Sequence, residues 1–584
     1  MSRSATATKL GFGARSNDRV PSVATPREAS IFASNTSYLV ALGLVLFFAA
    51  IVRLYFVMTT SFPLNDGGMF MQAIVDLQHS HFMLPQYIHY NGLPIPYAYP
   101  PLGFYVAGLV ASATHASLFT VLRIVPAIFS VLTVVAFMKL ADSYLGDRTT
   151  VVVASLAFSF VPRSFSWQIM GGGLTRSIGF FFGILAIWQA YLLFTQRSRR
   201  TLIWTTMFSS LACLSHLEMA WFVAFSAALL MLAYGRTRRG FLDAALVSAG
   251  VLILTSPWWG LVIERHGIEP FVYASHSGGH TIAVIVAYLL TLNWGQEQLF
   301  PLFGALALIG MLYCVVRRRY FLPVWVFTGL LLDPRKFETE AMVPMSMIVG
   351  ICVVTMILPL IREGAATLQS TESVESVAVP SGGRTPGRHW IGPVAVGIVV
   401  IYAMLASMFA TAIGDVPLST DERQAMQWVS QSTSPNSRFA IINGDDWAVD
   451  RSSEWFPVLA GRTSVATVQG NEWLPNDAFG NQVTSSLTLQ KCASETAACI
   501  DAWAVDEHAT FNYVYIASRE LEQGAIDSHV PCCSGLVESL ENDPNYELVF
   551  QNDGAAIFER RSAVAHVDGM FTEANAPGRR QTPL

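Results

Sequence analysis

The chain has 584 residues, of which 52% are hydrophobic and only 13% are charged. Soluble domains carry roughly 25% charged residues, so this composition excludes a soluble globular protein and indicates that most of the chain lies in a lipid bilayer. The formal net charge is −5, and the sequence has neither a basic face nor a useful basic tail, which excludes a nucleic-acid-binding protein.

Apolar runs begin after the N-terminal segment. Residues 1–36 contain Lys and Arg but no apolar run with a cleavage site, so we expect a disordered cytoplasmic arm and not a signal peptide. A membrane-crossing helix needs roughly 20 mostly apolar residues, which predicts an α-helical polytopic membrane protein with about 11 spans. The runs are Tyr38–Met58, Phe119–Leu140, Thr149–Phe165, Ser177–Thr195, Thr201–Ser215, Met219–Tyr234, Phe241–Trp258, Leu299–Val316, Phe321–Leu332, Ala341–Ile361 and Trp390–Thr411.

Charge asymmetry orients these spans, because basic residues prefer short cytoplasmic loops. With eleven spans, every basic loop is cytoplasmic; the loops are residues 146–148, 196–200, 235–240, 317–319 and the flexible linker 362–389. Counting the shorter run Leu102–Thr114 as a span would place two of these loops outside. We therefore interpret Leu102–Thr114 and Thr281–Leu292 as helices in the outer interface of the cell (plasma) membrane, with a cytoplasmic N-terminus and an extracytoplasmic C-terminal region.

The first outer loop, residues 59–118, carries the sequence Asn65-Asp66-Gly67-Gly68. This pattern is typical of a turn or an N-cap before a helix, and a carboxylate at the lipid–water boundary also suits a general base or a ligand for a divalent cation. Asp76 would lie about 15 Å further along an unbroken helix, so we expect it to be a solvated surface residue. Tyr99-Pro100-Pro101-Leu102 opens a helix, since Pro is tolerated at a helix start, and its Tyr favours the interface.

Several arginines and lysines are candidates for contact with a lipid phosphate. Arg53 and Arg123 lie near outer span ends, where we expect snorkelling to the interface by default, and Arg123 remains a candidate for phosphate contact. Gly171-Gly172-Gly173 and Arg176 precede a helix whose N-terminus can attract phosphate, with a plain tight turn as the alternative. The charged loop after Leu332 can bind phosphate or be ordinary surface. The candidate phosphate-binding residues are Arg123, Arg176, Arg335 and Lys336.

Four polar residues of the later outer loops are candidate metal or substrate ligands. His216 and Glu218 lie between two apolar runs, where an ionisable group costs roughly 2.5–3.5 kcal/mol and so indicates function; a structural His–Glu pair is the alternative. His276 and His280 flank Ser277-Gly278-Gly279 in a turn. If the loops converge, His216, His276 and His280 can bind one divalent cation.

The C-terminal region changes composition and predicts an extracytoplasmic α/β domain over residues 415–560, followed by a disordered tail, 561–584. We expect a helix at Thr420–Val429 capped by Thr420. The expected strands are Arg438–Ile442, Thr463–Val468, Asn512–Ala517, Tyr546–Gln551 and Ala556–Glu559. Pairs such as Asp446-Trp447 and Glu454-Trp455 suit carbohydrate binding, with an ordinary domain core and exposed acidic loops as the alternative.

The cysteines fall into two groups. Cys213, Cys314 and Cys352 lie in apolar runs and are expected to be inert. The four in the C-terminal region are compatible with disulfides outside the cytoplasm or with free thiols, and their spacing disfavours a metal knuckle. These four are Cys492, Cys499, Cys532 and Cys533.

The first outer loop resembles the GT-C superfamily of polytopic glycosyltransferases, which use polyprenyl-phosphate-linked sugars. Tyr99-Pro100-Pro101-Leu102 is similar to the Tyr/His-Pro-Pro-Leu element of dolichyl-phosphate-mannose protein mannosyltransferases and related families. The acidic Asp66 after the first span and Arg123 at the next add to the resemblance, which implies a GT-C-like membrane domain over residues 37–412. Family members often carry a paired acid in this loop, where two glycines follow Asp66 here. A second acid, common in a later outer loop of the family, is missing from Trp167–Arg176, and Glu218 or His216 can replace it.

The resemblance implies a membrane glycosyltransferase of the cell envelope. It would move a sugar from a polyprenyl-phosphate carrier to an acceptor hydroxyl of a lipid, glycan or protein at the outer face, with Asp66 as the base and a divalent metal cation as a candidate cofactor. Two alternatives stay open. A transporter or flippase would need polar residues along a path through the bilayer, and a non-catalytic assembly or binding protein would use the outer domain as its receptor.

Overall fold

The computed structural model describes residues 32, 34–277, 286, 289–333, 337–361, 363, 391–518, 520–522 and 529–561. The expected arm, cytoplasmic linker and tail lie almost entirely outside the described residues, as does most of the expected interfacial helix Thr281–Leu292.

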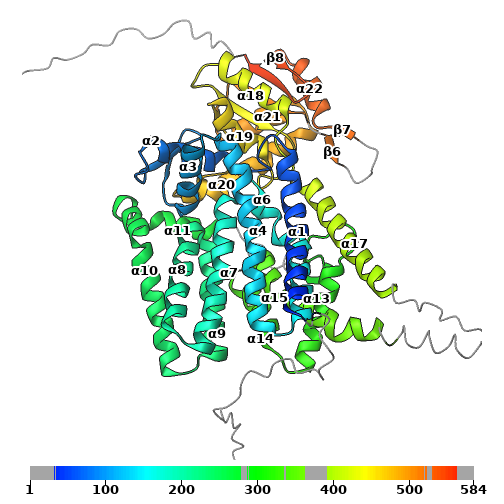
Figure 1. Cartoon of the computed structure of the whole chain (residues 1–584). Helices are drawn as coiled ribbons and strands as arrows, with labels where there is room; N and C mark the ends of the chain where they lie inside the picture. Colours follow the sequence, from blue (N-terminus) through cyan, green and yellow to red (C-terminus); the bar gives the residue numbers. More distant parts are fainter. Residues whose placement is uncertain are drawn as a thin grey trace, which may run out of the picture. The chain divides into compact units, whose positions relative to one another are not determined.

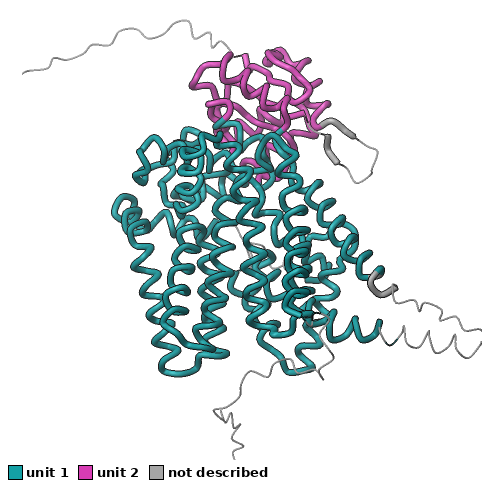
Figure 2. The backbone as a smooth tube through the Cα atoms, viewed as in Figure 1, with its two compact units in different colours: residues 1–418, 448–458, 468–483 teal, residues 419–447, 459–467, 484–584 magenta. Residues whose placement is uncertain are grey.

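The chain divides into two compact units (Figure 2). Unit 1 comprises residues 1–418, 448–458 and 468–483, and unit 2 comprises residues 419–447, 459–467 and 484–584. Two short segments of the C-terminal region therefore belong to the same compact unit as the apolar helices.

Unit 1 is a bundle of apolar helices (Figure 1). A helix covers most of each of the eleven predicted runs, and in the described part of the chain seven helices are long and apolar enough to cross a membrane. The helices are α1 (Asn35–Thr59), α4 (Leu118–Leu145), α5 (Arg148–Phe160), α7 (Gly173–Gln196), α8 (Arg199–Ser215), α9 (Leu217–Tyr234), α10 (Arg238–His266), α13 (Leu302–Val316), α14 (Phe321–Leu332), α15 (Phe337–Cys352) and α17 (Ile391–Gly414). A π-helical turn, Val353–Ile357, continues α15.

The core of the bundle lies around α7, which packs against α4, α8 and α9. Aromatic rings stack within the bundle: the ring centroids of Phe137 in α4 and Phe158 in α5 are 4.3 Å apart. Arg53 does not snorkel as expected. It is fully buried, and its guanidinium donates to the carbonyl oxygens of Ser130 and Phe158 and to the hydroxyl of Ser164. Because these acceptors lie inside the bundle, the Arg53 guanidinium is hydrogen-bonded without extending to the membrane interface.

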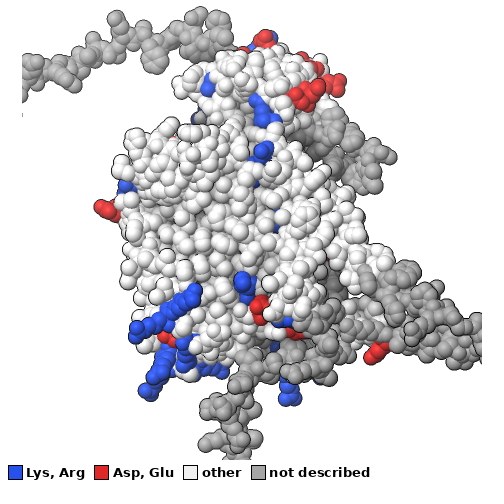
Figure 3. Space-filling model, viewed as in Figure 1, with Lys and Arg blue, Asp and Glu red and all other residues white. Residues whose placement is uncertain are grey.

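Successive helices run in opposite directions, so the turns between them lie at two opposite ends of the bundle. α7 begins beside Asp66 and its 24 residues extend about 36 Å, so the basic turn that joins it to α8 lies at the opposite end. α8 then returns to His216, and α9 leads away again to the basic turn before α10. Figure 3 accordingly shows Lys and Arg side chains gathered at the lower end of the bundle.

The first outer loop folds on the other end of the bundle. It contains α2 (Gly68–His79), an antiparallel hairpin of β1 (Tyr87–Tyr90) and β2 (Leu93–Pro96), and α3 (Leu102–Thr114). α3 has the predicted bounds with Pro101 as its N-cap, and it packs against α2, α4 and α7 (Figure 1). Asp76 is not solvated as expected: it is buried and accepts hydrogen bonds from the main chain of His89 (2.7 Å) and from Gln72 (2.9 Å).

Unit 2 contains a five-stranded mixed sheet in the order β4-β3-β5-β9-β8. β3 pairs in parallel with β4 and β5, and β9 pairs antiparallel with β5 and β8. The strands are β3 (Arg438–Ile442), β4 (Thr463–Ser464), β5 (Tyr513–Ala517), β8 (Tyr546–Gln551) and β9 (Ala555–Arg560). β4 is much shorter than the predicted Thr463–Val468. A small hairpin, β6 (Glu520–Glu522) with β7 (His529–Pro531), lies outside this sheet.

Helices of unit 2 include α18 (Thr420–Ser432), α21 (Ala497–Asp506) and α22 (Ser534–Glu541). The N-cap of α18 is Ser419 and not Thr420, because Ser419 and Glu422 form a reciprocal capping box. Two disulfides form, Cys492–Cys499 and Cys532–Cys533, so the free-thiol alternative does not hold for these four cysteines.

Candidate functional site

Asp66 lies between α1 and α2, and both of its carboxylate oxygens meet α7. Oδ1 accepts a hydrogen bond from the main-chain N–H of Gly172 at 2.9 Å, and Oδ2 accepts from Nη2 of Arg176 at 2.8 Å. The Asp66 side chain keeps 26% of its exposure and that of Arg176 keeps 14%. The N-cap expectation is wrong, since Gly67 caps α2 without a side-chain hydrogen bond. Asp66 instead stands at the N-terminus of α7, where a negative charge is favoured.

The glycines before α7 make this approach sterically feasible. A Cβ added to Gly172 would lie 2.6 Å from Cγ of Asp66, and one added to Gly171 would lie 3.3 Å from its carbonyl carbon. The main chain is also paired there, because Gly171 donates to the carbonyl of Leu64 at 2.9 Å. The missing side chains thus allow a close backbone approach, and the group that approaches is the Asp66 loop.

Arg176 lies in the first turn of α7 among polar and aromatic side chains. Its guanidinium lies 5.3 Å from the ring centroid of Trp167, and it interacts electrostatically with Tyr99 and Glu218 as well as with Asp66. A guanidinium between two carboxylates that retains some exposure is a suitable contact for an incoming anion.

His216, Glu218 and Tyr99 complete this group. His216 separates α8 from α9, is buried, and lies with Nδ1 3.8 Å from the Glu218 carboxylate. Its ring centroid is 6.0 Å from that of Tyr99, whose hydroxyl is 3.3 Å from the hydroxyl of Thr175. Tyr99, next to Pro100 and Pro101, therefore links the first outer loop to the start of α7.

Other predicted site residues lie elsewhere. Arg123 donates to the carbonyl oxygen of Thr60 at the end of α1, and the described contacts do not join it to Asp66 or Arg176. His276 ends α11 (Glu269–His276) and is exposed, without a described contact to His216. Three predicted residues, His280, Arg335 and Lys336, fall outside the described residues.

The residues around Asp66 do not fit a three-ligand metal site. In the described part of the chain, no three His, Cys, Asp or Glu side chains are arranged to hold a cation. Both Asp66 oxygens also accept hydrogen bonds from Gly172 and Arg176. We therefore assign no step of the chemistry to a metal.

Two segments far along the chain contribute residues that the sequence did not connect with Asp66. α19 (Arg451–Ala460) brings Glu454, whose Oε1 accepts from the main-chain N–H of Gly67 at 3.0 Å, and Trp455, whose indole N–H donates to the carbonyl of Asn65 at 2.7 Å. The short 3-10 helix Asn471–Trp473 packs Trp473 against Tyr99, with ring centroids 5.7 Å apart. Glu454 lies 388 positions after Asp66, and its only sequence signal is the Glu-Trp pair.

Asp415, just after α17, supports the same loop. Its carboxylate contacts Asn65 and accepts from the Ser166 hydroxyl at 3.0 Å. Burial, and secondarily the negative Asp66, raise the pKa of Asp415 to about 8. The Asp66 loop is thus held by a second buried acid besides Glu454.

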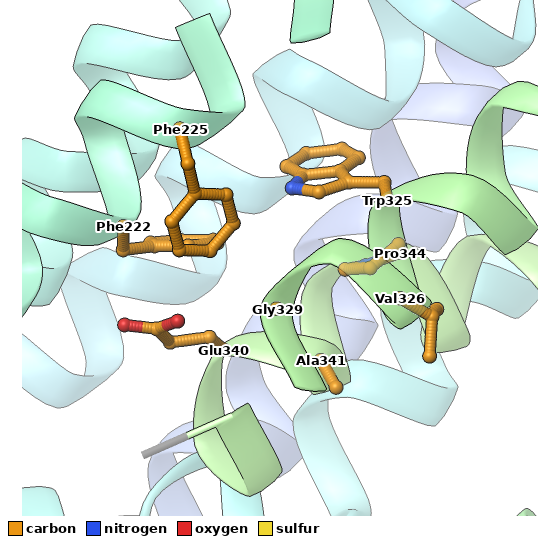
Figure 4. A pocket seen from close by; sticks show the side chains of 8 residues that line it. All are labelled: Phe222, Phe225, Trp325, Val326, Gly329, Glu340, Ala341 and Pro344. Carbon is orange, nitrogen blue, oxygen red and sulfur yellow. The ribbon is translucent and has the colours of Figure 1, made fainter. Parts of the chain in front are cut away.

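A separate small pocket lies between α9, α14 and α15 (Figure 4). It is lined mainly by apolar and aromatic side chains, with the carboxylate of Glu340 at its edge, and leaves no room even for a water molecule. Ligand sites usually enclose about 300–1,000 Å³, so this pocket is too small for a lipid-linked sugar.

Comparison with known proteins gives likenesses in structure only. No model of a protein family matches the chain, and no curated protein sequence matches it. Among solved structures, the archaeal oligosaccharyltransferase AglB from Archaeoglobus fulgidus, in complex with an inhibitory peptide and a dolichol-phosphate, aligns with a TM-score of 0.50 at 14% identity, covering 84% of this chain and 70% of that chain. The arabinofuranosyltransferase AftD from Mycobacteria aligns with a TM-score of 0.51 at 14% identity, covering 90% of this chain and 40% of that chain.

Both proteins are GT-C glycosyltransferases, as are other solved structures that match. At this identity the likeness concerns the fold, and it agrees with the resemblance that the first outer loop implies. The chain therefore has the fold of the polytopic GT-C glycosyltransferases.

Proposed function

We propose that this protein is a membrane glycosyltransferase that moves a sugar from a polyprenyl-phosphate carrier to an acceptor hydroxyl at the outer face of the membrane. The observation that carries the proposal is the pairing of Asp66 with Arg176 beside Tyr99, His216 and Glu218. These residues come from separate segments that the fold brings together at one end of the bundle. The dolichol-phosphate bound to AglB and the arabinofuranosyl transfer by AftD support a lipid-linked donor in general.

The geometry suggests how the two charged groups work together. The guanidinium of Arg176 donates to Oδ2 of Asp66. A donor phosphate would compete for the guanidinium, because charge-assisted bonds to phosphate are strong. Asp66 would then be released to accept the proton of the acceptor hydroxyl, which attacks the anomeric carbon in line and inverts it. Arg176 and the N–H groups at the start of α7 would stabilise the charge on the departing phosphate.

The test is a transfer assay on the full-length protein in lipid nanodiscs, with labelled polyprenyl-phosphate hexoses and pentoses offered separately. Asp66→Asn keeps an oxygen for the N–H of Gly172 but removes the base, so we expect at least about a 100-fold lower rate of transfer. Binding of the donor should be retained or become tighter, because the variant keeps Arg176 and removes the carboxylate charge that competes for its guanidinium.

Asp147→Asn is the matched control, since Asp147 is the N-cap of α5 and an Asn can serve as well. We expect its transfer rate to match the unmodified protein. Full activity of Asp66→Asn would remove Asp66 as the base. Movement of an intact lipid across the nanodisc or vesicle membrane, without sugar transfer from any donor, would instead favour the flippase alternative.

A further inference from the structure

We propose that Glu454 is a positioning residue for Asp66, and that it acts by accepting a hydrogen bond from the main-chain N–H of Gly67. The inference rests on the glycosyltransferase function proposed above, because it gives Glu454 a part in placing the base of that reaction. Glu454 is 5% exposed and its bond to Gly67 is 3.0 Å long. It reaches Asp66 through the main chain and not through substrate.

The backbone around Asp66 needs such support. Asn65 has a φ of 47° and Gly67 a φ of 137°, so the residues on both sides of Asp66 adopt conformations with positive φ. A glycine in this region pays no steric penalty but has many alternative conformations in a free loop. The direction of the Asp66 side chain therefore depends on contacts that fix this main chain from outside.

Two structures hold the loop from two sides. On one side, the N–H of Gly172 donates both to the carbonyl of Asp66 (3.1 Å) and to its carboxylate (2.9 Å). On the other side, the first turns of α19 supply Glu454 to the N–H of Gly67 and the indole of Trp455 to the carbonyl of Asn65. The main-chain groups flanking Asp66 are thus both bound by consecutive residues of one helix.

This turn of α19 is itself fixed by the first outer loop. The hydroxyl of Tyr90 in β1 donates to the carbonyl of Glu454 at 2.6 Å. A Cβ added to Gly68 would lie 3.1 Å from the carbonyl carbon of Glu454, so α2 begins in close contact with the main chain of α19. Glu454 therefore cannot shift without moving the start of α2.

The charge around Glu454 explains which feature of the side chain matters. Burial, and next the negative Asp66, raise the pKa of Glu454 to about 8, while the N–H of Gly67 and Arg176 act in the opposite direction. Glu472 and Tyr90 also face this carboxyl. The neutral form of the carboxyl is therefore favoured, and in either form a carboxyl oxygen can accept from the N–H of Gly67. A glutamine has the same shape and the same acceptor.

The proposal is tested by comparing Glu454→Ala with Glu454→Gln in the full-length protein in nanodiscs. We expect Glu454→Ala to lower kcat for sugar transfer by about 100-fold, because a misplaced catalytic group costs roughly that much. The KM for the donor should change by less than about threefold, since Arg176 is kept. Glu454→Gln should restore most of the lost kcat.

A second measurement follows the loop itself and does not depend on activity. Hydrogen–deuterium exchange of the peptide that contains Gly67 should become about tenfold faster in Glu454→Ala, the effect of losing one hydrogen bond. Exchange should return to the original rate in Glu454→Gln. Glu422→Ala is the matched control: Glu422 is also a buried glutamate that accepts from a main-chain N–H, at Ser419 in unit 2, so its loss should leave Gly67 exchange and transfer unchanged.

The outcomes separate the two proposals. Unchanged Gly67 exchange in Glu454→Ala, or equal loss of kcat in Glu454→Gln and Glu454→Ala, would overturn the positioning role and leave the glycosyltransferase function standing. If the unmodified protein transfers sugar from none of the labelled donors, the proposed function is wrong and the catalytic role of Glu454 fails with it.

Discussion

At the residue scale, Asp66 is defined by residues that have little or no side chain. Gly171 and Gly172 let the Asp66 loop lie directly on the start of α7, and Gly67 adopts a conformation that other residues rarely take. The acid reaches its partner Arg176 only because these positions leave the space open. The smallest residues of the site are therefore as important for its geometry as the charged ones.

Gly172→Ala tests this point. Its new Cβ would lie 2.6 Å from Cγ of Asp66, so the carboxylate must move away from Arg176. We expect transfer to fall by about 100-fold, as for other displacements of a catalytic group by about 1 Å. Gly183→Ala in the same helix is the control, because its Cβ would make an ordinary 3.5 Å contact with Val223. Equal rates of sugar transfer by Gly172→Ala and Gly183→Ala would show that the reaction tolerates displacement of the Asp66 carboxylate.

At the element scale, Arg53 joins three helices. It lies in α1 and binds carbonyl groups of α4 and α5 through Ser130 and Phe158, while the ring of Phe165 lies 4.9 Å from its guanidinium. A buried charge is tolerated where it is well paired and hydrogen-bonded. This arrangement fixes the spacing of α1 against the helices whose other residues support the site.

Arg53→Leu should destabilise the helix bundle without touching Asp66. It removes the hydrogen bonds that the guanidinium donates to Ser130, Phe158 and Ser164 inside the bundle, and we expect a loss of about 3 kcal/mol or more in the free energy of unfolding. Thermal unfolding in detergent measures this loss. Arg200→Leu, at an exposed position of α8, should change stability by less than about 0.5 kcal/mol. A melting temperature of Arg53→Leu equal to that of Arg200→Leu would contradict the structural role of Arg53.

At the scale of the whole molecule, the basic turns and the candidate site lie at opposite ends of the helix bundle. The basic turns after α7 and α9 lie a helix length away from Asp66, whereas His216 and Glu218 lie on the same side as Asp66. Basic loops favour the cytoplasm, so the candidate site is expected at the outer face.

Cysteine labelling tests this orientation. We expect an impermeant maleimide to label Glu507→Cys, in the turn after α21 of unit 2, on intact cells. Arg200→Cys, at the start of α8, should react only after the membrane is permeabilised, because its basic loop is expected to be cytoplasmic. The reverse pattern would invert the topology and place the candidate site inside the cell.

The features of this protein that depend on local pattern could be predicted from the amino-acid sequence. Apolar runs predicted the helices, and basic turns predicted which helix ends lie on the same side of the bundle. Pro100 and Pro101 predicted the start of α3. Alternating apolar residues likewise located β3 and β8 with their observed bounds. Such features are set by periodicity and backbone preference over a few neighbouring residues.

The contacts between residues far apart in the sequence could not be predicted and emerged from the folded chain. Asp66 pairs with Arg176, and Arg123 contacts the end of α1. Asp76 is buried, and Glu454 binds Gly67 from 387 positions away in the sequence. No local pattern encodes such contacts, because they depend on how helices far apart in sequence pack and on the space that the intervening glycines leave. A hydrogen bond between distant segments forms only when the fold of the whole chain brings the two segments together.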